Sequence, residues 1–178
     1  VKGKSGVTIG GGVDLGQRDE RDMNRLKIAD AATKARIIEG VRPFLGLKGD
    51  EARAALKTRS VDLDAGDIET LERAVKLDTY EAAEARFDRG RTPGTPAFRD
   101  LPPAAQTAIV SVAYNMGSAF LLTDNRKAPK FRDAILSANW PRAIEELREW
   151  SKTPDFPKWL LDRRMKEGDY LARGLRGN

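Results

Sequence analysis

Residues 5–17 read SGVTIGGGVDLGQ, and this stretch carries the strongest structural signal in the chain. Two short runs of β-favouring residues, 7–9 and 13–15, flank three consecutive glycines. Glycine adopts positive φ angles without steric cost, so a glycine run suits a tight reversal between two strands. The pattern therefore predicts a β-hairpin that places Thr8 and Asp14 near each other, a hydroxyl beside a carboxylate.

Such a pair can hold a water molecule, and a water activated by a carboxylate is a nucleophile. Two other interpretations stay open. The glycines could form a phosphate-binding loop, although Leu15 occupies the third glycine position of G-x-G-x-x-G and no lysine follows as in a P-loop. The hairpin could also be purely structural, with Thr8 and Asp14 on its solvent-exposed face.

The composition restricts the chemistry that the chain can perform. The 178 residues include no cysteine and no histidine. Disulfides, Ser-His-Asp triads and most zinc sites are therefore excluded. Acid–base chemistry must use carboxylates, which is typical of glycosidases, and we expect no metal and no cofactor.

The charge and hydropathy pattern is typical of a globular domain. The net charge is +5, which favours binding to anionic polymers, but basic residues are interspersed with acidic ones throughout the chain. We therefore expect no nucleic-acid partner. No apolar run approaches the ~20 residues needed to span a bilayer, and the chain shows no signal peptide, so we expect no membrane insertion.

The remainder of the chain is predicted to be helical. Apolar periodicity predicts separate helices over 64–75 and 79–89, followed by a loop at 89–96. The most hydrophobic helix should begin at Pro102-Pro103 and end at Gly117. Residues 118–129 should then form a loop with an exposed apolar patch at 120–122.

The sequence as a whole predicts a mainly α (α+β) protein. We expect one domain over 1–178, with a hairpin lobe at 1–25 and a helical part at 26–178.

A family resemblance lies on the same hairpin. Thr8-Ile9-Gly10, Gly12 and Asp14-Leu15-Gly16 together resemble the active-site hairpin of pesticin-type muramidases, which are relatives of the phage T4-type lysozymes in glycoside hydrolase family 24. In that family a threonine and an aspartate six positions later stand on the hairpin. Ala113-Tyr114-Asn115-Met116-Gly117 is similar to the corresponding helix of the family, and Arg163-Arg164 stands in a C-terminal helix similar to that of phage lysozymes, where the pair is expected to be structural or wall-facing.

The resemblance implies a two-lobed lysozyme-like fold and a muramidase, which cleaves the β-1,4 bond between N-acetylmuramic acid and N-acetylglucosamine by an inverting mechanism. Asp14 and Thr8 would be catalytic, and Gly10, Gly12, Tyr114 and Asn115 would bind substrate. The family also uses a glutamate on a helix before the hairpin as general acid. Residues 1–7 contain no acidic residue, so this glutamate is expected upstream of Val1, on a first helix in a longer protein.

The expected partner is peptidoglycan, together with an immunity protein that blocks the cleft, and the chain is expected to be a monomer. An antibacterial toxin, a secretion-system effector or a phage endolysin, secreted or delivered to the periplasm, would fit. The alternative hypothesis is a lysozyme-like module that binds peptidoglycan without hydrolysing it. The sequence that precedes Val1 would distinguish the two.

Overall fold

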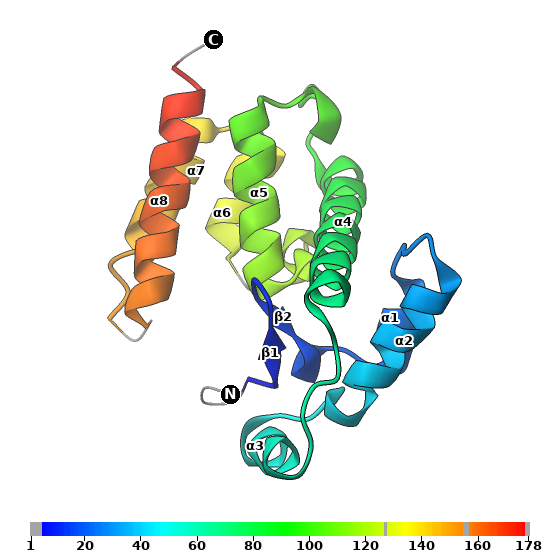
Figure 1. The fold of residues 1–178 in the computed structure, drawn as a ribbon. Coiled ribbons are helices and arrows are strands. Elements are labelled where there is room, and N and C mark those ends of the chain that lie inside the picture. The colour runs from blue at the N-terminus through cyan, green and yellow to red at the C-terminus, as the bar shows by residue number, and fades with distance from the viewer. Residues whose placement is uncertain (1–4, 127, 155–156, 177–178) are drawn as a thin grey trace. The chain divides into compact units, whose positions relative to one another are not determined.

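The computed structural model describes residues 5–126, 128–154 and 157–176 and is mainly α, with one small hairpin near the N-terminus (Figure 1). The predicted fold class is therefore confirmed. The chain divides into two compact units, Val1–Asp78 and Thr79–Asn178. Within the described ranges, no helix combines the length and the apolar character needed to cross a membrane.

The first unit contains the hairpin and the N-terminal helices. Its elements are β1 (Thr8–Ile9), β2 (Val13–Asp14), α1 (Glu20–Arg25), α2 (Ala31–Val41), α3 (Gly49–Thr58) and the beginning of α4 (Ala65–Gly90). The two strands pair antiparallel. Val7, Val13 and Leu15 are buried, whereas Thr8 is exposed and Asp14 is half-buried, so the hairpin has an apolar face and a polar face.

Carboxylate caps fix the helices that follow the hairpin. Asp19 caps α1 and forms a reciprocal capping box with Asp22, which explains why this highly charged stretch is helical. Arg36 on α2 binds the carboxylate of Asp67 on α4 with two hydrogen bonds, of 2.8 and 2.6 Å. The bidentate pair ties α2 to the first turn of α4.

α4 is one continuous helix, Ala65–Gly90, so the prediction of separate helices over 64–75 and 79–89 is wrong. Asp64 caps the helix, because its carboxylate accepts the backbone N–H of Asp67 at 2.7 Å. Residues 76–78 contain neither glycine nor proline, so nothing in the local sequence ends the helix between the two predicted segments.

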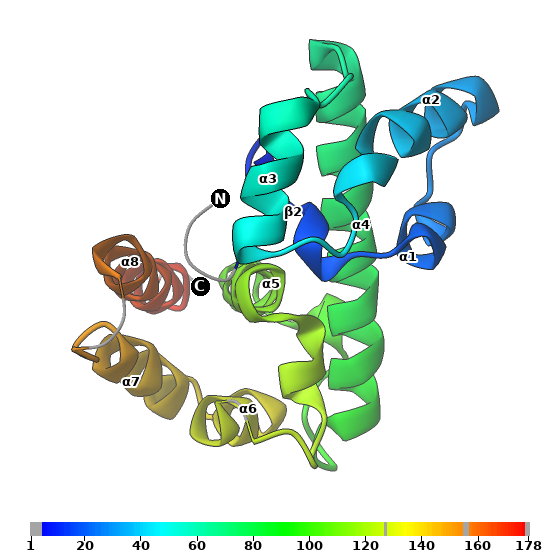
Figure 2. The same ribbon diagram turned by 90° about the horizontal axis from the view of Figure 1, so that it is seen from below.

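Among its described residues, the second unit contains the end of α4 and the α-helices α5 (Pro103–Met116), α6 (Pro129–Leu136), α7 (Trp140–Trp150) and α8 (Lys158–Gly174). α8 packs against both α5 and α7, and α6 packs against α7 (Figure 2). α5 supplies six buried residues to the core of this unit and ends, as predicted, at Gly117, which has a φ of 84°. The small side chains of α5 let its neighbours approach closely.

The prediction of an exposed apolar patch at 120–122 is wrong. Phe120 and Leu121 have relative exposures of 0% and 1%. They lie in a 3₁₀-helix, Ser118–Leu121, that turns their side chains into the core, where the ring of Phe120 stacks on that of Phe131 at 6.0 Å. Leu122 is half-buried.

Candidate functional site

Thr8 and Asp14 lie directly opposite each other in the hairpin. The backbone N–H of Leu15 donates to the carbonyl of Val7 at 2.9 Å, so 7 and 15 form a hydrogen-bonded pair. Such pairs alternate along an antiparallel ladder, which makes Thr8 and Asp14 a non-hydrogen-bonded pair, the type with the closest side chains. The hydroxyl and the carboxylate thus share the polar face of the hairpin.

Two backbone amides hold the carboxylate of Asp14. Its Oδ1 accepts hydrogen bonds from the N–H of Gly6 at 3.0 Å and from the N–H of Gly16 at 2.9 Å. Asp14 thereby also caps the 3₁₀-helix Leu15–Gln17. Because both donors bind the same oxygen, Oδ1, they fix the orientation of the carboxylate, and neither of these two bonds uses its second oxygen, Oδ2.

Gly6 and Gly16 must be glycines for these two bonds to form. A Cβ added to Gly6 would collide with the backbone of Gly16, and one added to Gly16 would collide with the backbones of Gly6 and Leu47. The close approach of the two glycines is what brings both amides to one carboxylate oxygen. Sequence inspection included Gly16 in the family pattern but assigned no function to Gly6.

Gly16→Ala is therefore expected to destabilise the protein and to move the carboxylate of Asp14. Overpacking of this kind costs roughly 1–3 kcal/mol, which thermal unfolding would detect as a lower Tm. Gly66→Ala is the matched control, because its added Cβ would meet only the Asp64 side chain at 3.3 Å and alanine favours a helix. An unchanged Tm for Gly16→Ala would show that the backbones of Gly6 and Gly16 do not lie as close together as described.

Gly10 and Gly12, which were predicted to bind substrate, form the exposed turn of the hairpin. Their φ angles are 50° and 118°, which favour glycine, and the N–H of Gly12 donates to the carbonyl of Ile9 at 3.3 Å. Both residues therefore have a conformational role in the turn. The structure places four of the predicted site residues, Thr8, Gly10, Gly12 and Asp14, on this one hairpin.

Tyr114 and Asn115, the other two predicted substrate-binding residues, lie on α5 in the second unit. Asn115 lines an open groove of about 640 Å³, together with charged and aromatic side chains that include Lys130, Glu146 and Trp150. Tyr114 does not line this groove, and the described part of the chain buries its hydroxyl oxygen. Of the two, Asn115 has the position that a ligand contact would require.

Arg164 fixes the amide of Asn115. Its guanidinium donates to Oδ1 of Asn115 at 2.8 Å and to the carboxylate of Glu167 at 2.6 Å, and it lies 5.9 Å from the ring centre of Trp150. The Arg164 side chain has a relative exposure of only 2%. Burial lowers the pKa of Arg164, and the neighbouring Glu167 carboxylate opposes that shift. Arg164 is therefore buried and held by contacts within the second unit.

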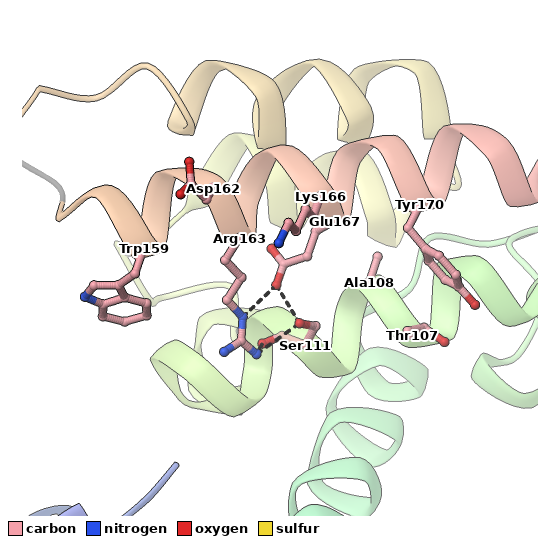
Figure 3. Close-up of a pocket in the computed structure, with 9 residues that line it drawn as sticks. All are labelled: Thr107, Ala108, Ser111, Trp159, Asp162, Arg163, Lys166, Glu167 and Tyr170. Carbon is pink, nitrogen blue, oxygen red and sulfur yellow. Dashed lines mark hydrogen bonds and ion pairs between the residues drawn. The ribbon is translucent and has the colours of Figure 1, made fainter. Parts of the chain in front are cut away.

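A second open groove, of about 520 Å³, lies between α5 and α8 (Figure 3). At its centre Ser111, Arg163 and Glu167 form a triangle of hydrogen bonds, with Ser111 donating to Glu167 at 2.5 Å and Arg163 donating to both partners. Trp159 and Tyr170 stand toward opposite ends of the groove and are largely exposed. None of the predicted site residues lines this groove.

Comparison with known proteins places the chain in one family. A family model described as "Pesticin: Bacterial toxin homologue of phage lysozyme, C-term" matches residues 1–141. The match includes the whole hairpin and extends through α6, and it confirms the resemblance seen in the hairpin sequence. A search of curated proteins finds no significant match.

Proposed function

Because the chain belongs to the family of bacterial toxins homologous to phage lysozyme, we propose that it is a muramidase that hydrolyses the β-1,4 bond between N-acetylmuramic acid and N-acetylglucosamine in peptidoglycan. The observation that carries the proposal is the Thr8–Asp14 pair, with the carboxylate oriented by two backbone amides. The absence of histidine and cysteine from the sequence also favours carboxylate chemistry.

In the proposed reaction, Oδ2 of Asp14 and the hydroxyl of Thr8 hold a water molecule. The water oxygen attacks C1 of the muramic acid residue while one of its protons passes to the Asp14 carboxylate. The bond between C1 and the glycosidic oxygen breaks, and that oxygen takes a proton from a carboxylic acid on the opposite side of the bond. Attack from the face opposite the leaving group inverts the anomeric configuration.

The general acid would be the upstream glutamate that the family resemblance implies. Residues 1–7, directly before the hairpin, carry no acidic side chain. An inverting enzyme needs its two carboxyl groups roughly 6.5–9.5 Å apart, which leaves room for the water.

We further propose that this protein acts as a toxin on the cell wall in the periplasm and works as a monomer. In this proposal the producing cell protects itself with an immunity protein that covers the site. The toxin family and the positive net charge, which suits anionic wall polymers, support this setting. Asn115 is the second-unit residue that we propose contacts substrate, because it lines an open groove.

The test is digestion of purified peptidoglycan, followed by reduction of the new sugar ends and mass analysis of the fragments. A muramidase leaves reducing N-acetylmuramic acid, which borohydride converts to muramitol. Reducing N-acetylglucosamine would indicate cleavage of the other glycosidic bond, and an anhydro-muramic end would indicate a lytic transglycosylase. Binding of peptidoglycan without any new end would favour the non-catalytic module.

Thr8→Ala is expected to slow cleavage about fivefold, because one hydrogen bond that positions the water, worth about 1 kcal/mol, is lost. Thr8→Ser is the matched control, since it keeps the hydroxyl and should retain most of the activity. Release of soluble fragments from peptidoglycan measures both rates. Equal rates for Thr8→Ala and the wild type would remove Thr8 from the water site.

A further inference from the structure

The glycine turn that joins β1 to β2 has little intrinsic rigidity. It contains three consecutive glycines, the residue type with the greatest backbone freedom, and each strand is only two residues long. An isolated two-stranded hairpin of this kind is marginal in water. The separation of Thr8 from Asp14 therefore depends on contacts that restrain the turn from outside.

Glu72 on α4 provides such a contact. One of its carboxylate oxygens, Oε1, accepts the backbone N–H of Gly11, although the two residues are 61 positions apart in the sequence. A Cβ added to Gly10 would collide with the same carboxylate, and one added to Gly11 would lie 3.1 Å from Oε2. The turn thus fits closely around the Glu72 side chain, and glycine is what permits that fit.

The carboxylate of Glu72 is held in its charged form. The backbone N–H of Gly11 is the main cause that lowers the pKa of Glu72, and the ammonium of Lys76, 3.2 Å away on the same helix, lowers it further. A hydrogen bond to an ionised acceptor is about twice as strong as a neutral one. The low pKa also makes Glu72 unsuited to act as a proton donor near neutral pH.

We propose that Glu72 is a positioning residue for the muramidase reaction: by holding the Gly11 amide it fixes the turn and, through the two short strands, the separation of Thr8 and Asp14. The inference rests on the proposed function, because it concerns the geometry of that water site. Glu72 itself does not touch the reacting atoms in this proposal. It links the first unit's part of α4 to the hairpin that carries the chemistry.

Kinetics on soluble peptidoglycan strands separate positioning from a merely structural role. Glu72→Ala is expected to lower kcat about tenfold or more, with KM changed less than about twofold, because a small misplacement of catalytic groups weakens only interactions of the transition state. Glu72→Gln keeps a neutral acceptor of the same length and should retain an intermediate kcat. Glu69→Ala is the matched control, since Glu69 lies one turn earlier on α4, is exposed and pairs with Arg73.

The same variants are compared by thermal unfolding, so that any loss of kcat is measured well below each Tm. A kcat for Glu72→Ala equal to that of the wild type and of Glu69→Ala would overturn the proposal. A lower Tm with unchanged kcat would overturn it as well, since that is the result of a purely structural contact.

A second readout does not depend on activity. In NMR spectra of the isotope-labelled protein, the chemical shift of the Gly11 amide should change with pH, with a midpoint below the ordinary pKa range of glutamate. Glu72→Gln should abolish this titration, whereas Glu69→Gln should leave it unchanged. A Gly11 amide that is identical in the wild type and in Glu72→Ala would show that the contact is absent. If the Gly11 titration is present but the wild-type protein releases no fragments, the proposed function has failed while the contact stands.

Discussion

Asp14→Asn is expected to lower peptidoglycan cleavage by about 100-fold to 10,000-fold, the usual loss when a general base is removed. The asparagine side-chain carbonyl can still accept the N–H groups of Gly6 and Gly16, so the hairpin should keep its structure. What is lost is the negative charge that accepts a proton from the attacking water. The expected result is therefore a folded protein with a normal Tm and almost no activity.

Release of soluble fragments from peptidoglycan, measured beside circular dichroism, tests this prediction. Asp50→Asn is the matched control, because Asp50 is an exposed carboxylate in the same unit and pairs only with Arg53 among the ion pairs of the described residues. That variant should keep wild-type activity. Wild-type cleavage by Asp14→Asn would show that the base lies elsewhere and would contradict the assignment.

Glu167→Ala is expected to have the largest effect on stability. Removal of this carboxylate leaves the buried guanidinium of Arg164 without its charge partner and also removes an acceptor from Arg163 and Ser111. Breaking a buried ion pair by deleting one partner typically costs about 3–5 kcal/mol. Denaturant unfolding should show a lower midpoint, with a similar slope if the transition stays two-state.

Two further variants make the stability prediction specific. Asp162→Ala, on the same helix, removes an exposed carboxylate that pairs with Lys158 and should change the free energy of unfolding by about 1 kcal/mol or less. The double variant Arg164→Met with Glu167→Leu should recover much of the loss, because apolar side chains can replace a buried ion pair. A Glu167→Ala midpoint equal to that of Asp162→Ala would show that the buried pair contributes little.

The hairpin could be predicted from the sequence because its signals are local. Two β-favouring runs and a glycine turn specify the reversal, and the alternation of strand residues places Thr8 and Asp14 on one face. The ends of α5 were predictable for a similar reason, since proline begins the helix and glycine ends it. Local backbone preferences were strong enough in both places to determine the structure.

The contacts that complete the site could not be predicted, because they join residues far apart in the sequence. Nothing near Glu72 indicates that it accepts the amide of Gly11, since a Glu–Lys pair four residues apart on a helix is a common surface pattern. The position of Gly6 against Gly16 likewise depends on how the chain folds back after β2. Both contacts are specified by packing rather than by local preference.

Two errors in the helical prediction have different origins. Residues 76–78 were left between two predicted helices, although none of them breaks a helix, and α4 continues through them. Phe120 and Leu121 stand between loop-forming residues and were predicted to be exposed, but one turn of 3₁₀-helix buries them beside Phe131. Tertiary packing thus explains the second error, whereas the first arose although the exposed residues 76–78 have no helix-breaking type among them.

The most direct test of the central claim is the anomeric configuration of freshly released product. Proton NMR, recorded within the first minutes of digestion of soluble peptidoglycan strands, distinguishes the two anomers of the new N-acetylmuramic acid end before they equilibrate. If Asp14 and Thr8 direct a water to the face opposite the leaving group, the α anomer forms first. Initial release of the β anomer would contradict direct attack by water and would require a covalent intermediate instead.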